Sequence, residues 1–274
     1  MKYIILCADD YGLNAGISQG IIDLLRRQRL SAVSCMSTGP SWSQYSLLLK
    51  PFENQVDLGL HFNLTEGRPV SPLYREKHGE RFSSLGKLIT RAYLGLLNEA
   101  AIEEELELQL KNFVDAMGFL PNFIDGHQHI QQLPIVREAL LKVYNNRLAV
   151  TKPYLRSAYH IGRIPGLSAN LKKKIIFYCG AAGFERLLVQ ADIPHNLAFS
   201  GIYNFSPSTN YAQLFPQFLS GLDSKGLIMC HPGIASAQDS DPIAAVRQLE
   251  YDYFASDQFP QDCLSQQVSI GRFA

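Results

Sequence analysis

The chain has 274 residues, of which 46% are hydrophobic, and its 25 basic residues balance its 25 acidic ones. This length can bury one large core and is close to the ~250 residues of a typical α/β barrel, so we expect a single domain over residues 1–274. The even charge and a pI near 7.0 give no excess that would bring the chain to nucleic acid or to a membrane surface, and they favour a small-molecule substrate.

The first sixty residues show strands that alternate with helices. In chain order, the pattern predicts strand 3–8, a helix capped by Asn14, strand 32–37, a short helix over 41–50 that Pro51 stops, and strand 56–61. This alternation is typical of an α/β barrel, in which each strand is followed by a helix.

Residues 63–98 break this rhythm with scattered charges, glycines and prolines. A connection of this length is unusual in a compact domain unless it serves a function, as active-site lids and binding loops do. We therefore expect a lid or substrate-binding insertion here.

A long helix is predicted over 99–117, where apolar residues form one stripe and Gly118 supplies the C-cap. Its acidic face, Glu103 to Glu107, is most simply explained as solvated surface. A strand over the run FIDG follows, then the polar turn HQH, and Pro134 opens the next helix.

Beyond residue 150 the pattern is weaker. It predicts, in chain order, a strand over LAVTKPYLR, a helix over 168–182 with a basic turn Lys172–Lys174, a helix over 211–220, strand 226–231, and a helix from Asp241 through Tyr253. No internal repeat, low-complexity tract or interdomain linker is visible.

The cysteines and the N-terminus indicate a cytoplasmic protein. The five cysteines are odd in number and form no CxxC pair, which indicates reduced, packed thiols at positions 7, 35, 179, 230 and 263. Only six apolar or small residues precede the first aspartates, too few for a signal peptide. No run reaches the roughly 18 apolar residues that would span a bilayer.

Four apolar runs, far apart in the chain, stop at residues that can bind metal. YIILCA ends at Asp9 and Asp10, VDLGL at His61, FIDG at His127, and GLIMC at His231. A strand buried on both faces reads as a continuous apolar run, so the polar residue lies where the core ends and a cleft can begin. Such strand ends meet at one face of a barrel, and the sequence therefore predicts one metal-dependent hydrolytic site.

Asp9, Asp10 and His61 each allow two interpretations. Side chains of neighbouring strand residues diverge, so one aspartate can bind a metal while the other faces the substrate as a base. A turn or a helix N-terminus would also explain the aspartate pair. A lone histidine at a strand end, such as His61, is more often a hydrogen-bonded structural residue than a ligand.

The run Asp125 to His129 carries two imidazoles beside a glycine, which packing alone hardly explains. Only one of them need bind metal. If the chain is extended, His127 and His129 share a face. If it turns, they separate, and His129 then lines the substrate pocket or orients a ligand, while Asp125 can hold an imidazole.

His231 precedes Pro232 and Gly233, which force a turn. A histidine held there can protonate a leaving group, although a cap or core histidine is an equally good interpretation. His78, His160 and His195 lie in segments with no supporting pattern, and we treat them as bystanders.

Four strings resemble one family when they are taken together in this order and at this spacing. They are ADDYGLN (8–14), GLHFNLTEGRPVS (59–71), DGHQH (125–129) and CHPG (230–233). The resemblance is to the YdjC-like carbohydrate deacetylases, which include chitooligosaccharide deacetylase, and it covers nearly the whole chain. It implies a deformed (β/α) TIM-like barrel related to polysaccharide deacetylases, which removes acetyl groups from N-acetylated sugars with one divalent cation.

The resemblance also implies roles for individual residues. The metal triad falls on Asp10, His61 and His127, the catalytic base on Asp9, and the general acid, as an imidazolium, on His231. Magnesium is usual in such proteins, while zinc suits the nitrogen-rich ligands by softness.

Further polar residues are expected to bind substrate or to support the metal ligands: Asn63, Glu66, Asp125, His129, Arg247 and Glu250. Polar residues near the last helix, here Asp241, Arg247 and Glu250, orient the base or the acid in similar proteins, although an exposed charged face explains them equally well. Family members often carry a further histidine where this chain has Gln131, and we expect that position to influence the choice of substrate.

Two other functions remain open. Another barrel metallohydrolase or a sugar isomerase would use similar residues, but phosphoryl substrates favour Lys or Arg near the site, and none accompanies these motifs. A non-catalytic sugar-binding relative would lack a catalytic group, whereas all five positions are filled here. The composition of the later helices is also compatible with a homodimer.

Overall fold

A curled parallel sheet forms the centre of the computed structural model, which describes residues 1–162, 180–235 and 241–273. Within these residues the eight strands are β1 Lys2–Tyr11, β2 Ala32–Cys35, β3 Asp57–Phe62, β4 Phe123–Gly126, β5 Tyr154–Leu155, β6 Ala198–Ser200, β7 Gly226–Cys230 and β8 Val268–Ile270. Their spatial order is β5-β4-β3-β2-β1-β7-β6, and β8 pairs with the first residues of β1. The recorded strand pairings are all parallel.

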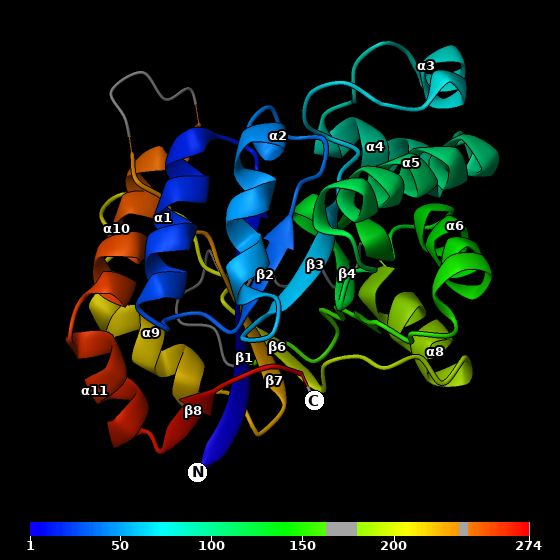
Figure 1. The fold of residues 1–274 in the computed structure, drawn as a ribbon. Helices are drawn as coiled ribbons and strands as arrows, with labels where there is room; N and C mark the ends of the chain where they lie inside the picture. The colour runs from blue at the N-terminus through cyan, green and yellow to red at the C-terminus, as the bar shows by residue number, and fades with distance from the viewer. Residues whose placement is uncertain (163–179, 236–240, 274) are drawn as a thin grey trace.

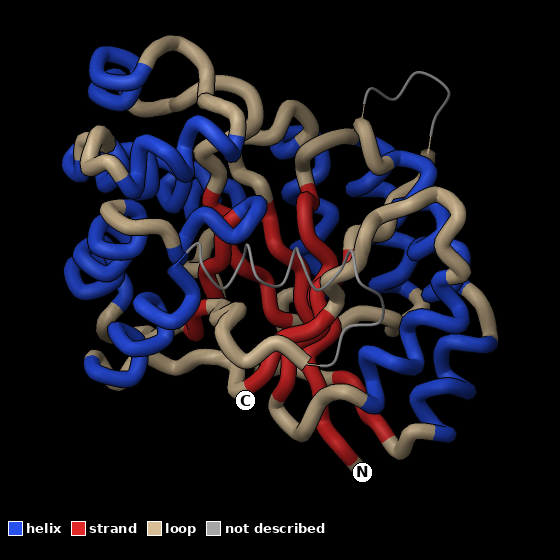
Figure 2. Tube along the Cα trace, turned by 180° about the vertical axis from the view of Figure 1, so that it is seen from behind, coloured by secondary structure: helices blue, strands red, loops and turns tan. Residues whose placement is uncertain are grey.

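The two edges of this sheet curl toward each other. Isolated parallel bridges join Leu155 to His195 and Ile161 to Phe199, so the end of β5 lies beside β6. The sheet is thus a half-barrel whose seam is irregular, as the prediction of a deformed barrel requires. Figure 2 shows the strands in the middle of the molecule with helices on both sides.

Helices cover the outside of the sheet (Figure 1). The α-helices are α1 Ala15–Arg26, α2 Trp42–Tyr45, α3 Pro72–His78, α4 Leu85–Tyr93, α5 Glu99–Met117, α6 Val136–Val143, α8 Ala182–Gln190, α9 Tyr211–Ser220, α10 Ala244–Ala255 and α11 Gln258–Ser265. Tighter or wider turns form η1 Ser46–Phe52, η2 His127–Gln132 and η3 Tyr144–Leu148. Among the helices that the structure describes, none combines the length and the apolar character that a membrane crossing requires.

Local sequence explains the ends of the helices that were predicted well. The Asn14 side chain accepts a hydrogen bond from the Ile17 amide at 2.8 Å, and Asn98 does the same for the Ala101 amide at 2.9 Å. Both caps satisfy amides that have no partner in the first helical turn. Gly118 ends α5 with a φ of 86°, a left-handed conformation that glycine adopts without strain.

Other predicted boundaries differ from the structure. The helix expected over 41–50 is one α-turn followed by the 3₁₀ segment η1, which runs through Pro51, because a proline near the end of a short segment removes only one hydrogen bond. The strand expected over LAVTKPYLR is reduced to Tyr154–Leu155. The helix predicted over 168–182, with Lys172–Lys174, lies largely outside the described residues.

The insertion over 63–98 contains two helices, α3 and α4, and it packs on α5. The Val70 and Ser71 amides donate to the Glu105 carboxylate at 3.2 and 2.7 Å, and the Leu73 amide donates to Glu104 at 3.0 Å. The prediction that this face of α5 is solvated is therefore wrong at Glu105, which is fully buried. The backbone amides at residues 70, 71 and 73 require hydrogen-bond acceptors because they are buried or partly buried, and the carboxylates of α5 accept these bonds.

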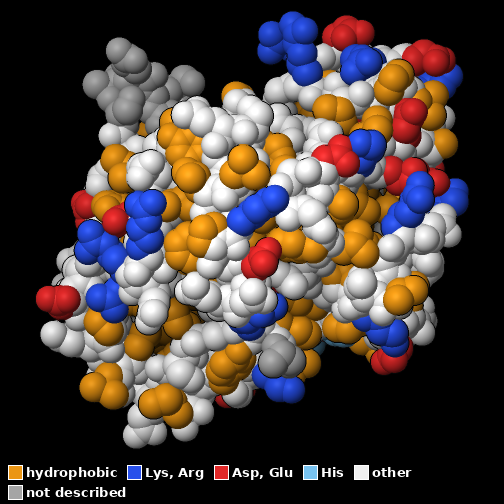
Figure 3. All heavy atoms as spheres, in the orientation of Figure 1, with side chains coloured by type: hydrophobic (Ala, Val, Ile, Leu, Met, Phe, Trp, Pro, Cys, Tyr) orange, Lys and Arg blue, Asp and Glu red, His pale blue; other side chains and the backbone are white. Residues whose placement is uncertain are grey.

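Charged side chains gather on the molecule over α3 to α6, at the upper right of Figure 3. Lys142 pairs with Glu103 at 2.5 Å and Arg147 with Glu107 at 3.0 Å, which joins α5 to the segment that follows it. Away from this surface the sheet is apolar, and Cys7, Cys35 and Cys230 are packed as free thiols within it. Cys179 lies outside the described residues.

Candidate metal centre and active site

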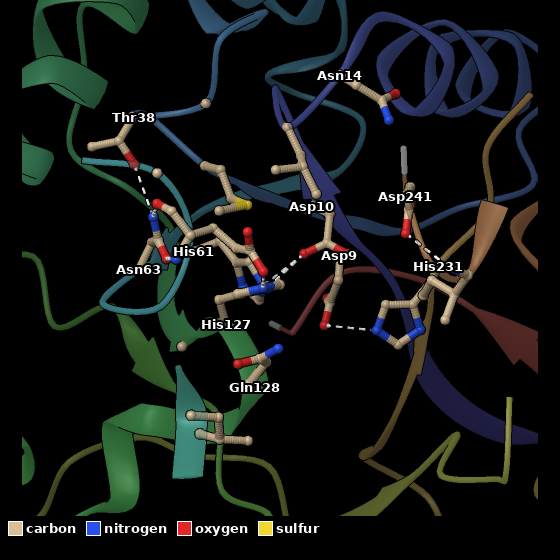
Figure 4. Close-up of a pocket in the computed structure, with 18 of the residues that line it drawn as sticks. Asp9, Asp10, Asn14, Thr38, His61, Asn63, His127, Gln128, His231 and Asp241 are labelled. Atoms are coloured by element: carbon tan, nitrogen blue, oxygen red, sulfur yellow. Dashed lines mark hydrogen bonds and ion pairs between the residues drawn. The ribbon is translucent and has the colours of Figure 1, made fainter. Parts of the chain in front are cut away.

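A cavity of about 910 Å³ opens at the carboxyl ends of the strands. Asp9 and Asp10 reach it from β1, His61 from β3, His127 from the end of β4, and His231 from the end of β7 (Figure 4). The structure thus brings together the residues at all four strand ends that the sequence singled out. In parallel α/β sheets this edge is where ligands bind.

Asp10, His61 and His127 present one ligand atom each to a common point. Asp10 Oδ1 lies 3.2 Å from His61 Nε2 and 2.9 Å from His127 Nδ1, and the two nitrogens are 3.3 Å apart. Asp10 Oδ1 is buried and has no hydrogen-bond partner among the residues that the structure describes. One carboxylate oxygen and two imidazole nitrogens suit a divalent cation, so these residues fit the metal that the sequence predicted.

The backbone of β1 turns the two aspartates apart. The register with β2 shifts between Ala8 and Tyr11, and Asp10 has a φ of 69°. This left-handed conformation is strained for a residue with a Cβ, and such strain is concentrated at functional sites. The bulge lets Asp10 face the two histidines while Asp9 faces elsewhere, as the prediction of diverging carboxylates requires.

Arg247 holds the other oxygen of Asp10. Its Nη2 donates to Asp10 Oδ2 at 2.7 Å, and its Nε donates to Asp241. Burial raises the pKa of Asp10, but the Arg247 guanidinium more than offsets this and lowers it well below its usual value. The carboxylate is therefore ionised and oriented before any cation binds.

Asp125 supports His61 from behind. Its Oδ1 lies 2.6 Å from His61 Nδ1, and the Ser34 hydroxyl lies 2.9 Å from the same nitrogen. Burial lowers the pKa of His61, but the Asp125 charge outweighs it and raises the value to about 10. A cation at Nε2 must displace a proton there, so cation affinity is expected to rise with pH.

Asp9 is paired with Arg156, a residue that the sequence reasoning missed. Arg156 is fully buried, and its two terminal nitrogens donate to the two Asp9 oxygens at 2.6 Å each. Burial raises the pKa of Asp9, but Arg156 outweighs it and lowers the value to about 2. The one feature of the sequence that could have indicated Arg156 is its position directly after strand β5, because the other site residues also lie at the ends of strands.

Arg156 also bridges to the metal triad. Its Nη2 lies 2.6 Å from Asp125 Oδ2 and donates to Cys7 Sγ at 3.0 Å. Cys7, Asp9 and Asp125 could in principle hold a cation themselves. The guanidinium lies among them and neutralises the two carboxylates, so we assign no metal to this cluster.

His231 lies beside Asp9, with Nε2 4.0 Å from Asp9 Oδ2 (Figure 4). Its backbone amide donates to Glu250 at 2.5 Å, and its ring meets Phe205 edge-on with centroids 5.2 Å apart. Burial lowers the pKa of His231 to about 4, against the opposing charges of Asp10 and Asp9. The imidazole is thus neutral near pH 7, so the imidazolium expected as the general acid has to gain its proton during the reaction.

His127 and His129 separate because the chain turns between them. Gln128 and His129 both have positive φ, at 57° and 60°. His129 lines the cavity, and its ring meets Phe199 edge-on with centroids 5.3 Å apart. Of the two alternatives drawn from the sequence, the turn is the one observed.

The side chains of Gln131 and Asn63 form hydrogen bonds within the protein. Gln131 is fully buried, donates to the Arg156 carbonyl at 3.1 Å and does not line the cavity. Its influence on the choice of substrate therefore stays a prediction, and any such influence acts through other residues. Asn63 lines the cavity, but its Oδ1 accepts from the Thr65 and Glu66 amides and its Nδ2 donates to Thr38 and to the Glu66 carbonyl. It shapes the turn that follows β3.

Two charged residues of α10, Arg247 and Glu250, are buried, so an exposed charged face does not explain them. Arg247 contacts Asp10, whereas Glu250 accepts from the His231 amide and from Tyr203. Arg247 thus contacts the candidate metal ligand Asp10 and not the expected base or acid, whereas Glu250 does contact the expected acid.

Arg68 also lines the cavity, which corrects the statement that no basic residue accompanies the motifs. His78, His160 and His195 do not line it. His78 accepts from the Asn98 amide, and His160 and His195 face Glu185 at 3.9 and 3.4 Å. These contacts agree with their treatment as bystanders.

Comparisons with known proteins give one consistent picture. Residues 3–265 match the family described as YdjC-like protein. A carbohydrate deacetylase of Danio rerio is 33% identical over 150 residues, which cover 52% of this chain and 46% of that protein. A chitooligosaccharide deacetylase of Serratia marcescens is 35% identical over 136 residues, covering 48% and 52%. These matches span about half the length of the curated relatives.

One solved structure shares the whole fold. It is a protein of Enterococcus faecalis with a suggested role in cellobiose-phosphate cleavage, and it has a TM-score of 0.74 at 17% identity, covering 99% of this chain and 97% of its own. A likeness at this identity establishes the fold alone. The match over residues 3–265 shows that the chain belongs to the YdjC-like protein family.

Proposed function

We propose that this protein is a metal-dependent deacetylase that releases acetate from N-acetylated sugars or oligosaccharides. The observation that carries the proposal is the triad of Asp10, His61 and His127, which shares one cavity with the Asp9–Arg156 pair and a neutral His231. The relatives named carbohydrate and chitooligosaccharide deacetylase support the reaction class.

Asp10 Oδ1, His61 Nε2 and His127 Nδ1 would hold one divalent cation. When bound there, the cation supplies Lewis-acid polarisation of an acetamide carbonyl and makes a water molecule acidic enough for a weak base. The family resemblance implies Mg²⁺, and the two nitrogen ligands suit Zn²⁺. The test of this proposal therefore uses both cations.

Asp9 is the proposed base. Arg156 keeps its carboxylate ionised, so at neutral pH it can accept the proton of the water whose oxygen attacks the acetamide carbon. His231 Nε2, 4.0 Å away and neutral, takes this proton from Asp9 and passes it to the nitrogen as the C–N bond breaks. The direct products are acetic acid and the amine, which become acetate and the protonated amine when the remaining proton of the water is transferred, and Asp9 ends the cycle ionised.

The insertion over 63–98 is the proposed substrate-binding element. Glu66, Gly67, Arg68 and Leu85 all line the cavity. Their polar and apolar side chains at the mouth suit a sugar, which presents hydroxyl groups and an apolar ring face. The 910 Å³ volume has room for a disaccharide-sized ligand.

The test combines metal analysis with acetate release. Purified protein would be depleted with a chelator, reloaded with Mg²⁺ or Zn²⁺, and incubated with N-acetylated mono-, di- and oligosaccharides. We expect about one cation per chain and acetate release that the chelator abolishes. Cation binding with hydrolysis or isomerisation of another substrate class would favour a different barrel enzyme, and tight sugar binding without turnover would favour a non-catalytic relative.

Two further predictions concern the whole protein: that it forms a homodimer and that it lies in the cytoplasm. Light scattering would test the homodimer, and a fluorescent fusion would test the cytoplasmic location.

A further inference from the structure

The two imidazoles of the triad each have a second nitrogen that points away from the metal position. In metal sites this outer nitrogen normally donates to a carboxylate or carbonyl, which fixes the tautomer and the orientation of the ring. For His61 the outer atom is Nδ1, and Asp125 lies 2.6 Å from it. For His127 the outer atom is Nε2, because Nδ1 faces Asp10.

Glu66 lies opposite the outer nitrogen of His127. Its Oε1 is 4.0 Å from His127 Nε2, too far for a hydrogen bond, and its side chain is 50% exposed at the cavity. His127 is itself largely enclosed, with 11% of its side chain exposed. A rotation of the Glu66 side chain that shortens this separation by about 1 Å would bring the atoms to hydrogen-bond distance.

The backbone of Glu66 is already held for such a contact. Asn63 Oδ1 accepts from the Glu66 amide at 2.9 Å, and Asn63 Nδ2 donates to the Glu66 carbonyl at 2.7 Å. Asn63 is in turn fixed to α5, since its amide donates to Gln109 Oε1 at 3.0 Å and its carbonyl accepts from Gln109 Nε2 at 2.7 Å. Only side-chain torsions of Glu66 remain free, so the contact requires no movement of the chain.

We propose that Glu66 is a positioning residue for the metal site: its carboxylate accepts a hydrogen bond from the His127 Nε2–H and so holds Nδ1 toward the cation. This inference rests on the proposed metal triad. Each imidazole would then have a carboxylate at its outer nitrogen: Asp125 of β4 for His61, and Glu66 of the insertion for His127. The insertion over 63–98 then contributes to cation affinity as well as to the cavity wall.

The experiment measures cation affinity without turnover. Zn²⁺ binding to the metal-depleted full-length protein would be measured by calorimetry for wild type, Glu66→Ala and Glu66→Gln, and Co²⁺ would report ligand geometry through its visible absorption. Glu80→Gln is the matched control, because Glu80 lies on the same insertion with 78% of its side chain exposed. Thermal melts would verify that each variant is folded.

We expect Glu66→Ala to weaken Zn²⁺ binding by about 10- to 100-fold and to change the Co²⁺ spectrum. Glu66→Gln should lose less, because its amide oxygen still accepts a hydrogen bond, and the control should match wild type. Unchanged Zn²⁺ affinity in Glu66→Ala, with a raised KM for the sugar, would overturn the inference and make Glu66 a substrate contact. Failure of wild type to bind any cation would instead overturn the proposed metal site, and this inference with it.

Discussion

At the scale of single residues, the site depends on how buried charges are paired. Asp9, Asp10 and Asp125 are nearly or fully buried, and each has a cationic or imidazole partner. An unpaired charge in such a place is strongly unfavourable. The same pairing therefore both stabilises the fold and sets the protonation state of each group.

Asp9→Asn and His231→Ala should separate catalysis from cation binding. Neither residue belongs to the triad, so we expect Zn²⁺ affinity to be kept while acetate release falls by about 10²- to 10⁴-fold, the usual contribution of a base or an acid. His61→Ala should lose the cation itself. Calorimetry and acetate release on the same preparations check this, and full activity of Asp9→Asn on a confirmed substrate would show that the base is another group.

Arg156→Met should destabilise the protein by about 3–5 kcal/mol, because it leaves the Asp9 and Asp125 carboxylates buried without their shared cation. Arg147→Met is the matched control, since 59% of the Arg147 side chain is exposed and solvent weakens its pair with Glu107. Urea denaturation measures both. Equal losses in the two variants would contradict the structural role of Arg156.

The strand-end residues could be predicted because each interrupts an apolar run, which is a local signal. Arg156 could not, since β5 has only two residues and no run marks its end. The orientation of Gln131 was beyond prediction for another reason. It depends on positive φ angles at Gln128 and His129, which their side chains do not demand.

At the scale of elements, the insertion over 63–98 is joined to α5 by buried polar contacts. Its helices α3 and α4 were not predicted, because they are short and flanked by glycines and prolines that indicate loops. The range predicted for α5, about 99–117, agrees with the structure, since 19 residues with one apolar stripe outweigh any local ambiguity. The apolar stripe could not reveal that two polar residues of α5, Glu105 and Gln109, are also buried.

Glu105→Ala should loosen the insertion while α5 stays folded. The variant leaves the Val70 and Ser71 amides without acceptors, and each lost partner costs on the order of 1 kcal/mol or more. We expect limited proteolysis within 63–98 to be at least about tenfold faster, because cleavage follows the population of the locally opened state. Glu107→Ala is the control, and equal cleavage rates would show that the insertion is anchored elsewhere.

At the scale of the whole molecule, the barrel closes at a seam that no sequence pattern marked. The strand order follows from right-handed β-α-β connections, which the alternating pattern predicts. At this seam, the two edges of the sheet are joined by two isolated β-bridges and by side chains from three separate segments. Glu185 on α8 accepts from the Ser157 hydroxyl after β5 and lies 3.4 Å from His195 before β6, so it joins the two edges.

This seam should give the protein a stability that depends on pH. Burial raises the pKa of Glu185, but its hydrogen bonds with His195 and Ser157 outweigh this and lower it. The hydrogen bond to Glu185 raises the pKa of His195, against the effect of burial. The Glu185 contribution is therefore complete above its usual pKa of 4.5 and lost as pH falls through its lowered folded value. The His195 contribution is complete below its usual pKa of 6.5 and lost as pH rises through its raised folded value.

His195→Gln tests this window directly. The difference in unfolding free energy between wild type and this variant should be largest between about pH 4.5 and 6.5, and it should shrink on both sides as one partner loses its charge. His160→Gln is the control, because His160 faces the same carboxylate at 3.9 Å with 61% of its side chain exposed, so solvent weakens its pairing. Denaturant titrations across pH would measure both differences. A difference for His195→Gln that does not vary with pH would mean that the imidazole holds the seam by packing, and that the barrel edges are joined without an ion pair.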